Sequence, residues 1–286
     1  MTEPRPGSTL PLLTRTRLLE VMAEHDLAPH RTLGQNFVID HNTIRKIVRL
    51  AGVQPDDVVV EVGPGLGSLT LGLLEAGASV RAVEIDARLV PAMQAITAGA
   101  AEVTVADALE VDWSKVTRGE PCTLVANLPY NVATPVVLRI LDEAPEIGRL
   151  VVMVQKEVAE RLAATPGSKA YGIPSVKVAY WATARMVGTI GSEVFHPRPK
   201  VTSALVEIIR RPQPVDGSDP TALFPLVKAG FGQRRKTLRR SLSSLVDDEA
   251  FVAAGVSPSA RAEELDVVAW CRLAAAVRNK AESALS

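Results

Sequence analysis

The chain has 286 residues, 47% of them hydrophobic and 22% charged, a composition that excludes a disordered chain and supports a full hydrophobic core. Its 32 basic and 32 acidic residues give a formal net charge of zero, so affinity for a nucleic acid or a membrane has to come from a local concentration of charge. This length suits one large domain, or a large domain followed by a small one.

The cysteine and histidine content argues against a disulfide framework or a metal site. Cys122 and Cys271 fall in a predicted strand and a predicted helix, which favours reduced thiols in the core. The histidines lack the spacing of metal ligands, so no metal is expected; they are His25, His30, His41 and His196. No apolar run reaches the length of a membrane span and the N-terminus lacks a signal-peptide core, so we expect a cytoplasmic protein.

Apolar strand-like runs alternate with helical patterns in the first half of the chain. The predicted strands are DVVVEV (57–62), SVRAVEI (79–85), EVTVAD (102–107), CTLVAN (122–127) and RLVVMVQ (149–155). Helical spacing of apolar residues occurs between them, at 68–77, 87–99 and 134–144. Nearly continuous apolar strands are typical of a parallel sheet covered on both faces, so the pattern predicts a doubly wound, mostly parallel α/β fold.

The pattern changes in the second half of the chain. Runs at 184–190 and 203–209 are predicted to form an antiparallel pair at the edge of the sheet. Three prolines then interrupt the segment 210–220, and the chain after it has helical patterns. We therefore predict an N-terminal arm at 1–33, an α/β domain at 34–211 and a small helical domain at 217–286.

Four successive predicted strands end in residues that suit a ligand site: Gly63, Glu84, Asp107 and Asn127. Ligands of open parallel sheets bind beyond the carboxyl ends of the strands, so these residues predict one elongated site. Glu84 suits the two hydroxyls of a ribose, although it could be a solvated charge at a turn. Asp107 suits an adenine amino group, although an Asp there is also a common helix N-cap.

The loop GPGLG (63–67) follows the first of these strands. Gly63 and Gly65 let the backbone approach a ligand closely, and Gly67 opens the following helix. The dinucleotide fingerprint requires a third glycine at position 68, where this chain has Ser68. Glycines also serve such turns for steric reasons alone, so the loop by itself leaves the ligand open.

The tetrapeptide NLPY (127–130) follows the strand CTLVAN and has the features of a site for an exocyclic amine. Asn127 Oδ1 and the carbonyl of Leu128 could accept the two N–H groups of such an amine. Pro129 fixes φ and helps to aim that carbonyl, while Tyr130 offers a ring face for an unstacked base. Acceptors for both N–H groups would favour a tetrahedral, nucleophilic nitrogen. The tetrapeptide therefore predicts that the group it holds is an adenine whose amino nitrogen acts as a nucleophile.

A series of short motifs runs in order through the chain from about residue 30 to 245: GQNFVID, VEVGPGLGSLT, VEID, AD (106–107), NLPYNVATPV, MVQKEVAERL, PGSKAYG, FHPRPKVTSALV and FGQRRKTLRRSL. Together they resemble the bacterial ribosomal RNA adenine N6-dimethyltransferases. QKEVAERL, PGSKAYG and FGQRRKT fit the small-subunit branch better than the large-subunit enzymes that confer macrolide resistance. The first 30 residues and the tail after about residue 245 match no motif.

This resemblance implies a Rossmann-like methyltransferase sheet at 34–211 and a small C-terminal helical domain that contacts RNA. It implies N6,N6-dimethylation of two adjacent adenosines in the hairpin loop near the 3′ end of 16S rRNA during small-subunit maturation. The implied cofactor is S-adenosyl-L-methionine. Its implied binding residues are Gln35, Asn36, Val38, Gly63, Gly65, Glu84, Asp107 and Asn127.

The resemblance also implies the residues that hold the target adenine: Asn127, Leu128, Pro129, Tyr130 and Phe195. Phe195 would cover the face of the base opposite Tyr130; the alternative is an ordinary loop anchor that packs on the core. The motif PGSKAYG (166–172) is either a plain surface hairpin or a mobile loop on the acceptor side.

A run of basic residues without acidic neighbours occupies 228–242, KAGFGQRRKTLRRSL. Helical spacing of Leu238, Leu242 and Leu245 would bury one face and leave most of the cations outside. Such a run is either a solvated helix face or a phosphate-binding surface. The RNA-binding candidates are Lys200, Arg234, Arg235, Lys236, Arg239 and Arg240. The expected partner is 16S rRNA in the small ribosomal subunit or its precursor, with no membrane contact and with the chain acting as a monomer.

Two other classes of protein remain as alternatives. A nicotinamide dehydrogenase would use the same sheet and Glu84, but it lacks the third fingerprint glycine and has no use for NLPY. A noncatalytic assembly factor on the same fold would have no need for intact cofactor and amine-binding motifs.

Overall fold

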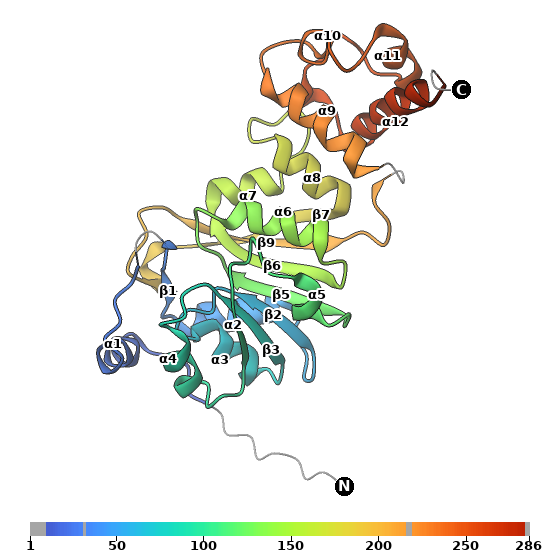
Figure 1. Ribbon diagram of the computed structural model, residues 1–286. Helices are drawn as coiled ribbons and strands as arrows, with labels where there is room; N and C mark the ends of the chain where they lie inside the picture. Colours follow the sequence, from blue (N-terminus) through green and yellow to red (C-terminus); the bar gives the residue numbers. More distant parts are fainter. Residues whose placement is uncertain (1–9, 31–32, 216–218, 284–286) are drawn as a thin grey trace. The chain divides into compact units, whose positions relative to one another are not determined.

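The computed structural model describes residues 10–30, 33–215 and 219–283 (Figure 1). The chain divides into two compact units. The first comprises the chain up to Lys156 together with Met186–Ile208, and the second comprises Glu157–Arg185 together with the chain from Ile209 onward. These units differ from the predicted domains, because residues 157–185 group with the helical part of the chain and not with the α/β part.

The central sheet has the strand order β4-β3-β2-β5-β6-β9-β7. Its strands are β2 (Val58–Val62), β3 (Ser79–Glu84), β4 (Glu102–Val105), β5 (Cys122–Asn127), β6 (Ile147–Gln155), β7 (Ala182–Ile190) and β9 (Ser203–Arg210). The pairs β2–β3, β3–β4, β2–β5 and β5–β6 are parallel, so the predicted doubly wound parallel sheet is confirmed. From β2 the chain first adds β3 and β4 on one side of the sheet, and then adds β5 and β6 on the other side. The crevice at such a switch point is where ligands bind in open α/β sheets.

The helices of the first unit are α1 (Arg15–Glu24), α2 (His41–Ala51), α3 (Ser68–Glu75), α4 (Val90–Ile96), α5 (Trp113–Thr117) and α6 (Ala133–Glu143). Helix α2 is capped at its N-terminus by Asp40, whose carboxylate accepts a hydrogen bond from Thr43 N at 2.7 Å. Its C-terminal cap is Gly52, which has the left-handed conformation with φ of 67°. A Cβ on Gly72 would lie 2.3 Å from Ile44 Cγ2, so the absence of a side chain at Gly72 lets α2 and α3 pack closely.

A short two-stranded sheet, which the sequence patterns did not indicate, also lies in the first unit. Strand β1 (Phe37–Val38) pairs antiparallel with β8 (Phe195–His196), with Val38 opposite Phe195. A 3₁₀ helix, Ser192–Val194, leads into β8. This pairing joins the GQNFVID segment to the FHPRPKV segment, two motifs far apart in the sequence.

The second unit is helical, as predicted for the end of the chain. Its helices are α7 (Lys156–Leu162), α8 (Ile173–Trp181), α9 (Pro220–Gly232), α10 (Leu238–Ser241), α11 (Asp248–Ala254) and α12 (Val267–Ser283), with a 3₁₀ helix at Ala262–Glu264. Leu238 and Leu242 are buried in its core, but Leu245, predicted on the same buried face, is 45% exposed. Among the described residues, no helix is long and apolar enough to span a membrane.

Candidate active site

A cleft of about 1050 Å³, open solvent included, lies at the carboxyl ends of β2, β3 and β5. Gly63, Glu84, Asp107 and Asn127 all line it, so the structure brings the four predicted strand-end residues to one site. Every residue that lines the cleft belongs to the first unit.

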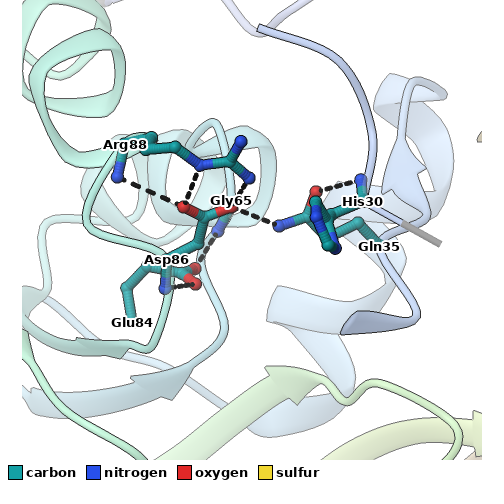
Figure 2. A network of polar contacts seen from close by, with 6 residues as sticks. All are labelled: His30, Gln35, Gly65, Glu84, Asp86 and Arg88. Atoms are coloured by element: carbon teal, nitrogen blue, oxygen red, sulfur yellow. Dashed lines mark hydrogen bonds and ion pairs between the residues drawn. The ribbon is translucent and has the colours of Figure 1, made fainter. Parts of the chain in front are cut away.

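Glu84 is buried at the end of β3, which rules out the alternative of a solvated charge at a turn. Its Oε2 accepts a hydrogen bond from Gly65 N at 3.0 Å and its Oε1 accepts one from Asp86 N at 2.9 Å (Figure 2). Burial raises the pKa of Glu84 above its ordinary value, while these N–H donors oppose the shift. Each carboxylate oxygen retains a further lone pair, so Glu84 is able to accept two hydroxyl groups of a ribose.

Asp107 follows β4 by two residues and has a structural role as well as a place in the cleft. Its Oδ1 accepts a hydrogen bond from Leu109 N at 2.8 Å, which stabilises a turn. The alternative interpretation, a helix N-cap, is wrong, because the next helix α5 begins at Trp113 and has Asp112 as its cap. Its Oδ2 makes no hydrogen bond within the described part of the chain. One oxygen is therefore available to an amino group in the cleft while the other fixes the turn.

The glycine loop brings the backbone of residues 63–67 close to an aromatic ring. Gly63, Gly65 and Gly67 have φ values of 69°, 60° and 84°, the left-handed region that favours glycine. A Cβ on Gly65 would lie 2.7 Å from the ring of Phe37, so that ring rests directly on the loop. Phe37 lines the cleft and was missed by the sequence analysis, which named its neighbours Asn36 and Val38.

Gln35 connects the segment before β1 to the end of β3, as Figure 2 shows. Its Nε2 donates to Asp86 Oδ2 at 3.1 Å, and its Oε1 accepts from His30 N at 2.8 Å. Arg88 donates to both oxygens of Asp86, at 2.8 and 2.7 Å, and this contact chiefly lowers the pKa of Asp86 to about 2. Both polar atoms of the Gln35 amide thus form hydrogen bonds within the protein. These bonds hold the segment before β1 in place beside the cleft.

Asn127 is oriented by a main-chain contact from the same segment. Its Nδ2 donates to Asn36 O at 2.8 Å, and Asn36 Nδ2 in turn donates to Gly34 O at 2.9 Å. Since the amide nitrogen is committed to a carbonyl, Asn127 Oδ1 is the group that remains to accept hydrogen bonds from a ligand. Gly34 packs tightly here, because a Cβ on it would lie 3.2 Å from Asn131 Oδ1.

Tyr130 is held by the strand β9. Its hydroxyl shares a hydrogen bond with Ser203 Oγ at 2.7 Å, and Ser203 is fully buried. Burial raises the pKa of the Tyr130 phenol above its ordinary value, which keeps the hydroxyl protonated. Leu128, Pro129 and Tyr130 all line the cleft, so the tetrapeptide NLPY forms one wall of it.

Phe195 does not line the cleft, in contrast to the prediction that it stacks on the target base. Its side chain is 2% exposed and packs in the hydrophobic core, and its backbone pairs with Val38. A ring in this position is a loop anchor, which was the alternative interpretation.

Glu61 is a second residue of the cleft that the sequence analysis missed. It is 1% exposed, and its Oε2 accepts a hydrogen bond from the Thr70 hydroxyl at 2.6 Å. Burial raises the pKa of Glu61 to about 8, so the group is largely neutral near neutral pH. A carboxylate inside the apolar run VVVEV was the signal that could have identified it, because such a residue is costly to bury without a function.

The predicted RNA-binding residues lie outside this cleft, and two of them have acidic partners. Arg234 forms an ion pair with Glu263 at 2.5 Å, and Arg239 forms one with Asp248 at 3.0 Å. The segment 228–242 contains no acidic residue, but Glu263 and Asp248 from other segments pair with two of its arginines. Four candidates are exposed and have no carboxylate partner in the described part of the chain: Lys200, Arg235, Lys236 and Arg240.

Comparisons with known proteins agree with this site. The family model of ribosomal RNA adenine dimethylases matches residues 27–279. The ribosomal RNA small subunit methyltransferase A of Arthrobacter sp. (strain FB24) is 48% identical, covering 98% of this chain and 99% of its own. The protein of the same name from Streptomyces avermitilis is 50% identical, covering 96% of each chain.

Solved structures are similar over most of the chain. A dimethyladenosine transferase from Plasmodium falciparum superposes with a TM-score of 0.74 at 22% identity, covering 86% of this chain and 98% of its own, which shows the shared fold. The 23S rRNA methyltransferase ErmE has a TM-score of 0.65 at 27% identity, covering 85% of this chain and 99% of its own. With a family model matched over most of its length and relatives at 48–50% identity, the chain belongs to the ribosomal RNA adenine dimethylase family.

Proposed function

We propose that this protein transfers methyl groups to N6 of two adjacent adenosines in the hairpin loop near the 3′ end of 16S rRNA, during maturation of the small ribosomal subunit. Membership of the family supports the reaction, and the small-subunit relatives support the branch. The observation that carries the proposal is Asn127, whose amide nitrogen is held by Asn36 O so that Oδ1 is left for the acceptor amine at the wall of the cofactor cleft.

The cofactor is S-adenosylmethionine, and the residues of the cleft fit it. Buried Glu84 suits the ribose hydroxyls and the open oxygen of Asp107 suits the adenine amino group. Gly63 and Gly65 line the cleft without adding side chains to it, and Asn36 and Val38 also line it. When bound, the cofactor supplies a methyl group on a sulfonium, which is electrophilic enough to react without an additional acid.

The protein would then align and desolvate the acceptor amine. The lone pair of an exocyclic amine is drawn into the base, so acceptors for its two N–H groups favour a tetrahedral, nucleophilic nitrogen. Asn127 Oδ1 and the carbonyl of Leu128 are assigned to these N–H groups, and the ring of Tyr130 is assigned to the face of the base. The nitrogen becomes far more acidic once it is methylated, so water is a sufficient base for the proton that leaves.

We also assign the partner and the place of action. The partner would be 16S rRNA in the small subunit or its precursor, which places the protein in the cytoplasm. A monomer suffices for the reaction, because the cleft is lined by residues of one unit of one chain. Exposed Arg235, Lys236 and Arg240 are the candidates for phosphate contacts in the second unit.

A large-subunit specificity is the second candidate, since ErmE shares the fold. Identity to ErmE is 27%, against 48–50% for the small-subunit relatives, which favours the small-subunit assignment. A noncatalytic assembly factor is disfavoured by a cleft in which Glu84, Asp107 and Asn127 are each oriented by hydrogen bonds.

The test is to incubate the protein with labelled S-adenosylmethionine and, separately, immature small subunits, large subunits and naked ribosomal RNA. Mass spectrometry of the nucleosides should show N6,N6-dimethyladenosine from small subunits, and Asn127→Ala should show little. Label in large subunits alone would favour the second candidate. Cofactor binding without label in any acceptor would favour the assembly factor.

A further inference from the structure

Three segments of the second unit converge on Arg234: the loop 165–171, the turn 233–236 and the 3₁₀ helix 261–264. Arg234 Nε donates to Glu263 Oε2 at 2.5 Å, and its Nη2 donates to the carbonyl of Lys169 at 3.0 Å. Gly167 N donates to the carbonyl of Glu263 at 2.8 Å. The loop is therefore fastened from two sides by hydrogen bonds to groups distant in sequence.

The base of the loop is anchored as well. Tyr171 is 1% exposed, and its hydroxyl donates to Leu265 O at 2.9 Å. Its ring meets Phe231 edge to face, with centroids 6.0 Å apart. Within the loop, the Ser168 hydroxyl donates to Thr165 O at 2.7 Å. These contacts favour a fixed loop over both earlier interpretations of the PGSKAYG motif, a plain hairpin and a mobile one.

The exposed charge at this place is mainly positive. The three segments contain five basic residues and two acidic ones: Lys169, Arg234, Arg235, Lys236 and Arg261 against Glu263 and Glu264. Glu263 is already neutralised by Arg234. Lys169, Arg235 and Lys236 are exposed, and none of them has a carboxylate partner within the described part of the chain.

Arg234 differs from its two neighbours in what it offers to a ligand. To bind a phosphate with both arms of its guanidinium, Arg234 would have to break its ion pair with Glu263. The half-buried Glu263 carboxylate would then lie unpaired beside the phosphate, which is unfavourable. Arg235 and Lys236 have no such partner to give up. Arg234 is therefore paired within the protein, whereas Lys169, Arg235 and Lys236 are exposed to solvent and have no carboxylate partner in the described residues.

We propose that the loop 165–171 forms part of the RNA-binding surface of the second unit, in which Lys169, Arg235 and Lys236 contact phosphates while Arg234 is a positioning residue that holds the loop in place. This inference rests on the proposed function for its partner, an RNA. It adds Lys169 to the surface and removes Arg234 from the predicted phosphate contacts.

The first experiment measures affinity for purified small subunits at several salt concentrations. Each phosphate contact contributes about 0.7 to 0.9 to the log–log salt slope. Lys169→Gln and Arg235→Gln should each flatten the slope by about that amount. Arg272→Gln, which removes the same charge from an exposed position on α12, is the matched control and should keep the wild-type slope. A wild-type slope for Lys169→Gln would overturn the assignment of the loop.

The second experiment separates the two possible roles of Arg234. The exchange Arg234→Glu with Glu263→Arg restores the ion pair with its charges reversed, so it should retain the wild-type salt slope. Because a glutamate cannot donate to the carbonyl of Lys169, hydrogen exchange in residues 165–171 should become faster in this variant. Arg234→Gln should also make hydrogen exchange in residues 165–171 faster, because the loop loses the contacts that the guanidinium makes with Lys169 O and Glu263. If the charge exchange flattens the slope as Arg235→Gln does, Arg234 contacts phosphate directly and the positioning role is wrong.

The proposed function is checked on its own in the same preparations. Wild-type protein should dimethylate small subunits, and a failure of that reaction counts against the function. If the wild type is active and the Lys169 variant binds like the Arg272 control, only the surface proposal fails.

Discussion

Asn127 Nδ2 donates to Asn36 O at 2.8 Å, which ties the tetrapeptide NLPY to the segment GQNF across 91 residues of sequence. The contact determines which end of the Asn127 amide faces the acceptor. An amide whose nitrogen is engaged presents its oxygen, and only an oxygen is able to accept the N–H groups of an amine. Asn36 thereby acts on the proposed chemistry through its main chain.

We expect Asn127→Ala to lower turnover by on the order of 100-fold, the scale for the loss of one preorganised hydrogen-bonding group. Affinity for S-adenosylmethionine should fall much less, because Glu84 and Asp107 remain. Asn127→Asp should also be slow, since a carboxylate cannot donate to Asn36 O. Single-turnover kinetics and calorimetry separate the two quantities; equal losses in both would assign Asn127 to cofactor binding alone.

Glu84→Ala should weaken S-adenosylmethionine binding by about 1.5 to 3 kcal/mol, the scale for hydrogen bonds to a charged group. The variant also leaves Gly65 N and Asp86 N without their acceptor, so Glu84→Gln, which keeps one acceptor oxygen, is the matched control. Calorimetric titration measures both variants, with circular dichroism to confirm folding. Wild-type affinity in the alanine variant would remove Glu84 from the site.

Tyr130→Phe should retain most of the activity, because a stacking platform needs the ring and not the hydroxyl, whereas Tyr130→Ala should lose about 1 to 3 kcal/mol of base binding. The phenylalanine variant leaves the buried Ser203 hydroxyl without its partner, which costs about 1 to 3 kcal/mol of folding stability. Tyr130→Phe with Ser203→Ala should recover part of that loss. An inactive Tyr130→Phe together with an active Tyr130→Ala would contradict the stacking role.

Glu61 should make the folded protein less stable as the pH rises. Burial raises the pKa of Glu61 to about 8, above its value in the unfolded chain, so the folded state holds a proton that the unfolded state releases. Stability should therefore decline between about pH 4.5 and 8, and Glu84, whose pKa is also raised, contributes in the same direction. In Glu61→Gln the decline of Tm with pH should be shallower. Parallel Tm profiles for both proteins would show that Glu61 ionises normally.

The strands and helices around the cleft could be predicted because their signals are local. The apolar runs of β2, β3, β5 and β6 and the glycines of the GPGLG loop depend on neighbouring residues and on backbone conformation alone. Parallel strands bring their carboxyl ends to one edge, so the convergence of Gly63, Glu84, Asp107 and Asn127 also followed from the order of elements.

Tertiary structure alone decided what the remaining side chains contact. Gln35 meets Asp86 across 51 residues and Arg234 meets Glu263 across 29, and neither pairing leaves a periodic signal in the sequence. Phe195 is buried because β8 pairs with β1, a two-residue contact too short to have a pattern. Local propensity and periodicity determined the sheet and the edge at which the cleft lies, whereas burial and long-range polar contacts depend on which segments pack together, and that is set only when the whole chain folds.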